Sequence, residues 1–300
     1  MGKKRTIDSG RRDSRGRRIM VSAADSQSVV GKKDVLASYS IEDSPLDDYG
    51  YDTMHFVDKE RFIKETDDID VVKYISRHGN SQQKRQVTHN PLLSPEMVDY
   101  MVNSAQSWEL RSDLAKVPGI SEKAQEKLIS HEEEGVLSSL AKNPTVSEET
   151  LFELSKFRVT NWNGRRKPDL MSGVIKNVMD NPNASDRCFN RIHDEAQRGR
   201  GPGATNMNMK MLLMSHSGTP GNILRDLYEG SNGNHAVQRV LMNNPNTPSK
   251  IFSDIVDNPG SEHIAAELIS LDRTTPEQAL KLKNDPSEIV QEAYVKRFGE

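Results

Sequence analysis

The His, Cys, Asp and Gly residues are the first place to look for chemistry in this sequence. The eight His residues are scattered, and no HExxH pair is present that would gather a metal ion. The string GRGPG at 199–203 lacks the Lys-Ser/Thr pair of a phosphate-binding loop. The spacing of Asp43, Asp47, Asp48 and Asp52 does not fit a calcium loop, and no Ser-His or Cys-His arrangement is legible. We therefore expect no catalytic residue, no cofactor, no metal site and no enzymatic activity.

The first 33 residues concentrate basic side chains. Ten Lys and Arg stand against three Asp there, with almost no apolar anchors, which is typical of a segment that does not fold alone. We expect 1–33 to be a basic arm, disordered or ordered by a partner, that suits nucleic acid or an acidic protein surface; a solubilising tail is the alternative. Its candidate partner-binding residues are Lys3, Lys4, Arg5, Arg11, Arg12, Arg15, Arg17 and Arg18. An acidic linker is expected over 34–63, because 34–70 hold twelve acids against three bases.

The rest of the chain repeats one phrase: an apolar helical turn, then Asn-Pro or a relative, then Thr/Ser or Pro, then another helix. The turns begin at Asn90, Val117, Asn143, Asn181, His216, Asn244 and Asp272. Neighbouring turns are 26–28 residues apart, except for two spacings of 38 and 35. This periodicity predicts stacked two-helix repeats over 64–300.

Alignment on the turn shows the expected core. Apolar residues recur seven and three positions before it, and eight and eleven positions after it, which predicts one amphipathic helix on each side. The residues three before the turn are Val87, Leu114, Leu140, Val178, Leu213, Leu241 and Ile269. Those eight after it are Val98, Leu151, Phe189, Leu224, Phe252 and Leu280. All of these are expected to be core, as are Val290 and Tyr294 in a last half-repeat.

The turn residues explain where helices end and begin. A residue before Pro is pushed out of the α region, so an Asn-Pro pair ends the first helix, and the Asn side chain can bond the local backbone. Thr219, Thr247 and Thr275 precede Pro and are expected to cap the second helix, as is Ser94. Ser147 is expected to cap another.

The phrases Leu140-Ala141-Lys142-Asn143-Pro144 and Asn244-Pro245-Asn246-Thr247-Pro248 resemble the leucine-rich repeat variant family, a HEAT-like class of α-solenoid. The resemblance covers about 64–300 and departs from the pattern at Val117, His216 and Asp272. It implies architecture more than function, because solenoids serve many roles. Some HEAT-like proteins of similar architecture are DNA glycosylases, but this sequence supplies no convincing catalytic acid or aromatic pocket.

Two insertions account for the long spacings. Both follow the second helix of their repeat, at Arg158–Pro168 and Gln197–Asn206, so they are expected to emerge along one edge. They would form a basic patch with one aromatic residue, suited to a phosphate backbone or an acidic protein segment. Solvated loops without a partner are the alternative. The candidate residues are Arg158, Trp162, Arg165, Arg166, Lys167, Arg198 and Arg200.

Together these features predict an all-α fold: a right-handed α-solenoid of about seven to eight two-helix repeats, preceded by an extended N-terminal arm. The sequence contains no apolar run long enough to suggest a signal peptide or a membrane span. The lone Cys188 fits a reducing, cytoplasmic compartment. The leading hypothesis is a non-enzymatic scaffold that binds a large partner or assembly, such as a phage or virus particle. The alternative is a nucleic-acid-binding module that contacts phosphates.

Overall fold

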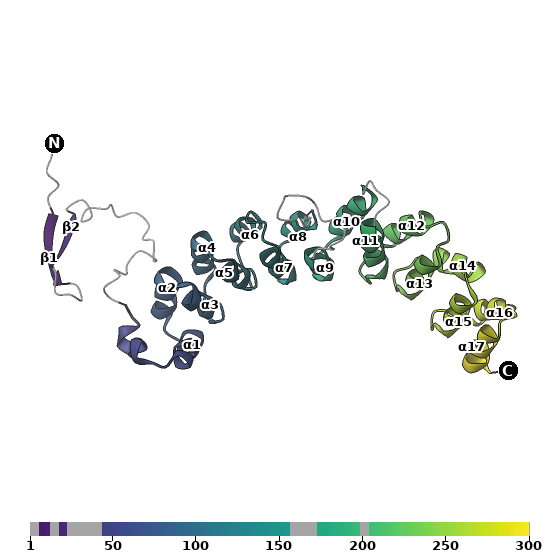
Figure 1. Cartoon of the computed structure of the whole chain (residues 1–300), viewed down its shortest axis with the longest axis horizontal. Coiled ribbons are helices and arrows are strands. Elements are labelled where there is room, and N and C mark those ends of the chain that lie inside the picture. The colour runs from purple at the N-terminus through teal and green to yellow at the C-terminus, as the bar shows by residue number, and fades with distance from the viewer. Residues whose placement is uncertain (1–5, 13–17, 23–43, 157–172, 199–203, 300) are drawn as a thin grey trace. The chain divides into compact units, whose positions relative to one another are not determined.

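The computed structural model describes residues 6–12, 18–22, 44–156, 173–198 and 204–299. The chain divides into two compact units, Met1–Ala105 and Gln106–Glu300, and each is described by itself. Within the described residues, the units contain helices and one short hairpin, labelled in Figure 1. The predicted all-α repeat architecture is confirmed.

Unit 1 begins with a hairpin that the sequence analysis did not predict. Strands β1 (Thr6–Arg12) and β2 (Arg18–Ser22) pair antiparallel, with Ile7 opposite Val21. The short 3-10 helices η1 (Asp47–Tyr49) and η2 (Tyr51–Thr53) follow further along the chain. The helices of the unit are α1 (Phe56–Glu65), α2 (Ile69–His78), α3 (Ser81–Val87) and α4 (Pro95–Ser104). Helix α1 packs on α3 and α2 packs on α4, which is the arrangement of two stacked repeats.

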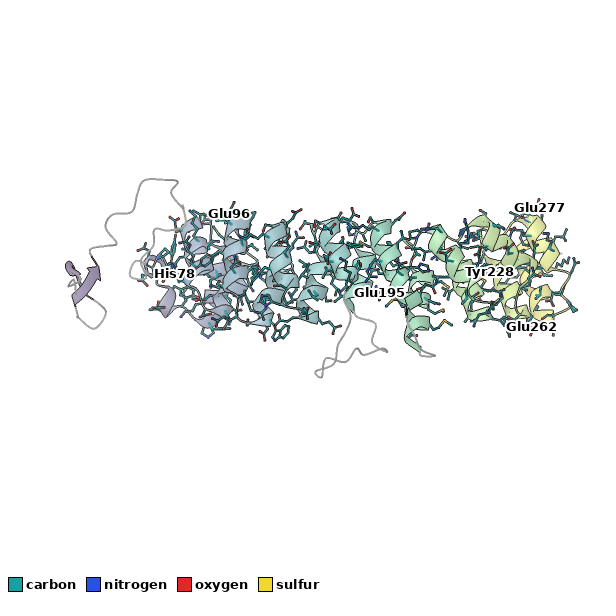
Figure 2. The ribbon with its side chains drawn as sticks, turned by 90° about the horizontal axis from the view of Figure 1, so that it is seen from above. His78, Glu96, Glu195, Tyr228, Glu262 and Glu277 are labelled. Atoms are coloured by element: carbon teal, nitrogen blue, oxygen red, sulfur yellow. The ribbon has the colours of Figure 1, made fainter. Side chains whose placement is uncertain are left out.

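Unit 2 continues the pattern in two rows. Its helices are α5 (Trp108–Leu114), α6 (Glu122–Ile129), α7 (Glu134–Lys142), α8 (Glu148–Ser155), α9 (Gly173–Asp180), α10 (Asp186–Arg198), α11 (Ala204–Ser215), α12 (Gly221–Glu229), α13 (His235–Asn243), α14 (Ser249–Asp257), α15 (Glu262–Ser270), α16 (Pro276–Leu282) and α17 (Glu288–Phe298). First-row contacts join α5 to α7, α7 to α9, α11 to α13, α13 to α15 and α15 to α17. Second-row contacts join α6 to α8, α8 to α10 and α14 to α16. Glu262 and Glu277, near the starts of α15 and α16, lie on opposite edges in Figure 2, because the two rows run antiparallel.

The core of each unit follows the predicted stripes. All seven predicted residues three before the turn are buried, and so are five of the six residues eight after it. Leu280 is the exception, at 57% exposed, and its assignment to the core was wrong. Leu151 and Phe252 of this series lie on α8 and α14, which the following second-row helices α10 and α16 contact, whereas α16 is the last second-row helix of the described residues. Val290 is buried as predicted, and Tyr294 is half-buried.

Buried Asn side chains at the turns join each repeat to the one before it. The Nδ2 atom of Asn143 donates to the carbonyl oxygens of Ala115 (2.9 Å) and Val117 (2.8 Å) in the preceding turn. Its Oδ1 accepts from the Thr145 N–H, so both ends of the amide are used. The same turn clasp, defined as a side chain at the start of a turn that donates to carbonyls of the preceding turn, is made by Asn90, Asn181 and Asn244. Each clasp satisfies carbonyls that the end of a helix leaves unpaired.

Arg and His replace Asn at other turns. Arg297 bonds the carbonyls of Ile269 and Leu271, and Arg273 donates to the carbonyls of Asn244 (2.9 Å) and Thr247 (3.1 Å). In His216 the Nδ1 atom accepts from the Gly218 N–H at 3.0 Å, as the Asn oxygen does elsewhere. Its Nε2 lies 3.1 Å from the Asp180 carboxylate rather than on a carbonyl. The turns that use Arg or His in place of Asn are therefore still bonded to the repeat before them.

The expected capping role of two Thr residues was wrong. Helices α12 and α14 begin one residue later than expected, with Pro220 and Pro248 at their N-caps. The hydroxyls of Thr219 and Thr247 are buried and donate to the carbonyls of Leu213 and Leu241, both at 2.6 Å. These carbonyls lie at helix ends and also accept the backbone N–H of His216 and Asn244, respectively, so each Thr hydroxyl is a second donor.

The other predicted caps are confirmed. Thr275 caps α16, with Pro at the first helical position, and Ser94 and Ser147 cap α4 and α8. At the last turn the buried, carbonyl-bonded role falls to Thr274, which precedes the cap by one residue.

The turn clasp predicts a large stability difference between two neighbouring Asn residues. Asn244→Ala should lower the free energy of unfolding by about 3 kcal/mol, because it leaves the buried Met214 carbonyl without its donor and removes one of the two donors to the His216 carbonyl. The matched control Asn246→Ala removes two bonds from an exposed side chain and should cost about 1 kcal/mol. Urea unfolding followed by circular dichroism measures both, and equal losses would contradict the role assigned to Asn244.

The different roles of Thr275 and Thr247 predict that substitution by Asp affects stability very differently at the two positions. Thr275→Asp should change the free energy of unfolding by less than about 0.5 kcal/mol, since Asp is a good N-cap. Thr247→Asp should cost at least about 3 kcal/mol, because an ionised carboxylate cannot donate to the Leu241 carbonyl and would be buried beside it. Comparable melting temperatures for the two variants would show that Thr247 is a cap after all.

Candidate interaction surface

The predicted basic surface lies largely outside the described residues. This is so for Arg158, Trp162, Arg165, Arg166, Lys167 and Arg200 of the insertions, and for Lys3, Lys4, Arg5, Arg15 and Arg17 of the arm. The backbone of Arg11, Arg12 and Arg18 belongs to the hairpin, where Arg12 stands opposite Arg18. Arg198 is the last residue of α10. The basic patch therefore stays a prediction.

The helices that flank the insertions are described. One insertion joins α8 to α9 and the other joins α10 to α11, so both connect a second-row helix to the next first-row helix. In Figure 2 the label of Glu195, near the end of α10, lies toward the same edge as Glu262. The second insertion is shorter than expected, because α10 extends to Arg198 and α11 begins at Ala204.

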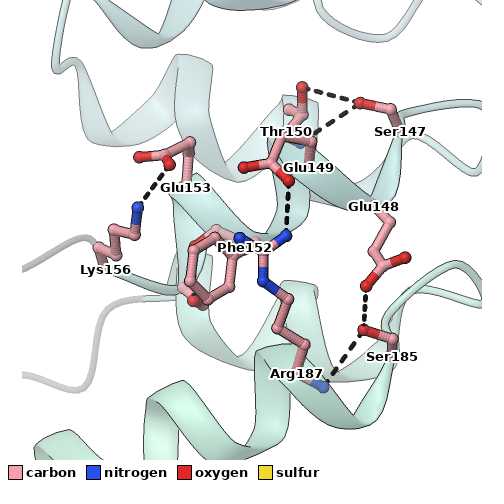
Figure 3. Close-up of polar contacts among 10 residues, drawn as sticks. Ser147, Glu148, Glu149, Thr150, Phe152, Glu153, Lys156, Ser185 and Arg187 are labelled. Carbon is pink, nitrogen blue, oxygen red and sulfur yellow. Dashed lines mark hydrogen bonds and ion pairs between the residues drawn. The ribbon is translucent and has the colours of Figure 1, made fainter.

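The described surface between α8 and α10 pairs its charges internally. The Arg187 guanidinium stacks 3.6 Å from the centre of the Phe152 ring and donates to Glu149 at 2.6 Å (Figure 3). Lys156 lies 4.4 Å from the same ring and pairs with Glu153. Because both cations have a carboxylate, this surface offers an aromatic face but no free positive charge.

A different pair of cations converges on Tyr100 in unit 1. The guanidinium carbon of Arg77, in the last turn of α2, lies 5.5 Å from the centre of the Tyr100 ring on α4. The Lys84 ammonium on α3 lies 6.0 Å from the same centre. Within the described residues neither cation has an ion pair or a hydrogen bond, and the Arg77 Nε is buried without a partner. We call Arg77, Lys84 and Tyr100 the cation–tyrosine cluster.

Lys84 occupies a position that faces the core in other repeats. The residues six positions before the turn are Lys84, Arg111, Leu137, Ile175, Lys210, Gln238 and Ala266. Leu137, Ile175 and Gln238 are buried, as is Lys84 itself at 9% exposed. The sequence analysis missed this position, although the alignment contained the signal: a lysine at a position that is apolar in three of the other six repeats.

Two of the other three polar residues at this position, Arg111 and Gln238, have partners within the chain. Arg111 donates to Glu133 from Nε at 2.8 Å, and from Nη2 at 2.5 Å. This contact lowers the pKa of the Glu133 carboxyl below its usual range. Gln238 bonds the Asn258 carbonyl and the Gly260 N–H. Burial without such a partner lowers the pKa of Lys84 below that of an ordinary lysine.

The described residues offer little else for chemistry. They contain no group of three or more His, Cys, Asp or Glu that could hold a metal ion. Burial raises the pKa of the Cys188 thiol, which makes it a poor nucleophile. An open pocket of about 270 Å³ beside Tyr51 and Phe56 is lined by Gln82 and Gln86, whose amides both bond Glu60.

Among the described helices, none has the length and apolar character needed to cross a membrane.

Comparison with known protein families, with curated proteins and with solved structures finds no match to this chain. The resemblance to the leucine-rich repeat variant family therefore remains a prediction from the repeat phrase.

The desolvated ammonium of Lys84 predicts a pH-dependent cost to stability. Because its pKa is lower in the folded chain than the ordinary value of about 10.4, the cost is full at neutral pH and disappears as the pH rises through the folded value toward that of the unfolded chain. Lys84→Met removes the charge and keeps the volume, so it should raise the melting temperature at pH 7 by roughly 2–4 °C. The difference between variant and parent should narrow as the pH approaches 10, whereas a constant difference would contradict the lowered pKa.

Proposed function

We propose that this chain is a non-enzymatic interaction protein, which uses its solenoid surface and N-terminal arm to bind a large protein partner or assembly, such as a virus particle. The cation–tyrosine cluster is the observation that carries the proposal. Elsewhere on the scaffold, polar side chains such as Asn143 and Arg111 are used for contacts within the chain. Arg77 and Lys84 keep their charges uncompensated within the described residues, although this destabilises the fold.

The arrangement of the described residues supports binding rather than catalysis. Catalysis needs a nucleophile, base or metal held in a closed site. No group of three or more metal-ligating side chains occurs among the described residues, and the aromatic-lined pocket beside Tyr51 and Phe56 is open. A repeat scaffold with an unpaired charged cluster suits recognition of another molecule.

Nucleic-acid binding is the second candidate, and the net charge of +7 over 1–33 favours it. Phosphate contacts and protein contacts differ in their response to salt. Release of counterions makes nucleic-acid affinity fall steeply with salt concentration, in proportion to the number of neutralised phosphates. A protein interface with few charged contacts responds less.

A native pull-down with the full chain tests the two functions. The bait is incubated with lysate of its source organism, with and without nuclease, at a low and a high salt concentration, and bound proteins are identified by mass spectrometry. We expect a defined protein partner that survives nuclease and moderate salt. A chain that lacks residues 1–33 is the matched variant and should bind the same partner more weakly. Loss of all partners after nuclease would instead support the nucleic-acid function.

A further inference from the structure

We propose that the cation–tyrosine cluster is a binding site for the carboxylate side chain of an acidic segment of a partner protein. The inference rests on the proposed function and names the chemistry that the partner presents. Three observations carry it: two unpaired cations beside one ring, a carboxylate bound to the cation at the equivalent position of the next repeat, and the net negative charge of residues 44–105.

The first observation is the missing counter-charge. Lys84 is 9% exposed and has a lowered pKa, and the Arg77 Nε is buried without a partner within the described residues. The Tyr100 ring balances these charges weakly, because a cation–π contact at 5.5–6.0 Å is worth less than a charge-assisted hydrogen bond. An anion supplied from outside would provide the counter-charge that the described residues lack.

The second observation shows which anion fits. At the equivalent position of the next repeat, Arg111 is satisfied by the carboxylate of Glu133, which precedes helix α7. The stretch NSAQS at 103–107, which precedes helix α5, holds no acidic residue. The cluster therefore has Lys84 at the position of Arg111, but the stretch that corresponds to Glu133 holds no acidic residue.

The Tyr100 ring keeps the site open to a partner. Its side chain is 42% exposed although it stands beside a buried lysine. The cations that approach the ring come from two different helices, Arg77 from α2 and Lys84 from α3. A carboxylate that pairs with the cations can also accept a hydrogen bond from the Tyr100 hydroxyl.

The third observation separates a protein partner from a polyanion. Residues 44–105 hold eleven Asp and Glu against seven Lys and Arg, so this part of the unit is negatively charged. A continuous phosphate backbone would be repelled by those carboxylates along its length. A single acidic side chain can enter the cluster and leave the surrounding acids solvated.

Peptide binding to the full chain tests the site. The probe is a fluorescein-labelled octapeptide of Gly with one central Glu, titrated by fluorescence anisotropy into the millimolar range at low salt. The same octapeptide with Gln in place of Glu and an eight-nucleotide oligothymidylate are the comparison ligands. The protein variants are Lys84→Met, Arg77→Met and Lys84→Arg, which keeps the charge. Lys59→Met is the matched control, because Lys59 lies 5.1 Å from the Tyr51 ring in the same unit but outside the cluster.

We expect the Glu peptide to bind more tightly than the Gln peptide, and the Met variants of the cluster to weaken it about tenfold, the loss of one charge-assisted contact. Lys84→Arg should retain most of the affinity, and Lys59→Met should bind within about twofold of the parent. Lys84→Met should melt no lower than the parent, so its lost binding cannot be attributed to unfolding.

Three outcomes would overturn the site. These are no preference for Glu over Gln, equal losses in Lys84→Met and Lys59→Met, or tighter binding of the oligonucleotide that is lost in the same cluster variants. If the acidic peptide fails while the native partner survives nuclease, the site is wrong and the proposed function stands. If all native partners are lost with nuclease, the proposed function itself fails.

Discussion

The hydrogen bonds from one turn to the carbonyls of the turn before it are the interaction on which the rest of this structure depends. A short helix leaves its last carbonyls without partners, and a helix of seven to nine residues has little stability of its own. The amides of Asn143 and Asn181 satisfy the carbonyls of the neighbouring repeat and accept a backbone N–H of their own turn. One side chain therefore ends a helix and holds its turn against the previous repeat.

The clasp explains why the sequence of the turns can vary without loss of the fold. Arg297 and Arg273 reach the same kind of carbonyl acceptors with a longer side chain, and His216 reproduces only the acceptor half of the Asn amide. Val117 has neither a donor nor an acceptor in its side chain. Where a turn makes the clasp, the reach of the hydrogen-bonding group matters more than the residue type, and the turn at Val117 forms without a side-chain donor.

The cation–tyrosine cluster illustrates the opposite case, in which a scaffold position carries a buried charge that, in our proposal, serves binding. The position of Lys84 is filled by Leu137 and Ile175 in other repeats, where it contributes apolar burial. A lysine there loses that contribution and is desolvated, so the fold would be more stable without it. Such a cost is common at sites whose role is recognition. Arg111 shows that a cation is tolerated at this position once a carboxylate is supplied.

The sequence alone determined the helical repeats, the turn positions and nearly all of the core, because the apolar stripes and Asn-Pro pairs act within one or two helical turns. It also placed the caps at Ser94, Ser147 and Thr275. Only the tertiary structure decided that Thr219 and Thr247 donate inward, that Leu280 is exposed, and that Arg77, Lys84 and Tyr100 meet. Each of these depends on which neighbouring helix lies against the residue, and that packing follows from the way the helices stack, which spacing along a single helix does not contain.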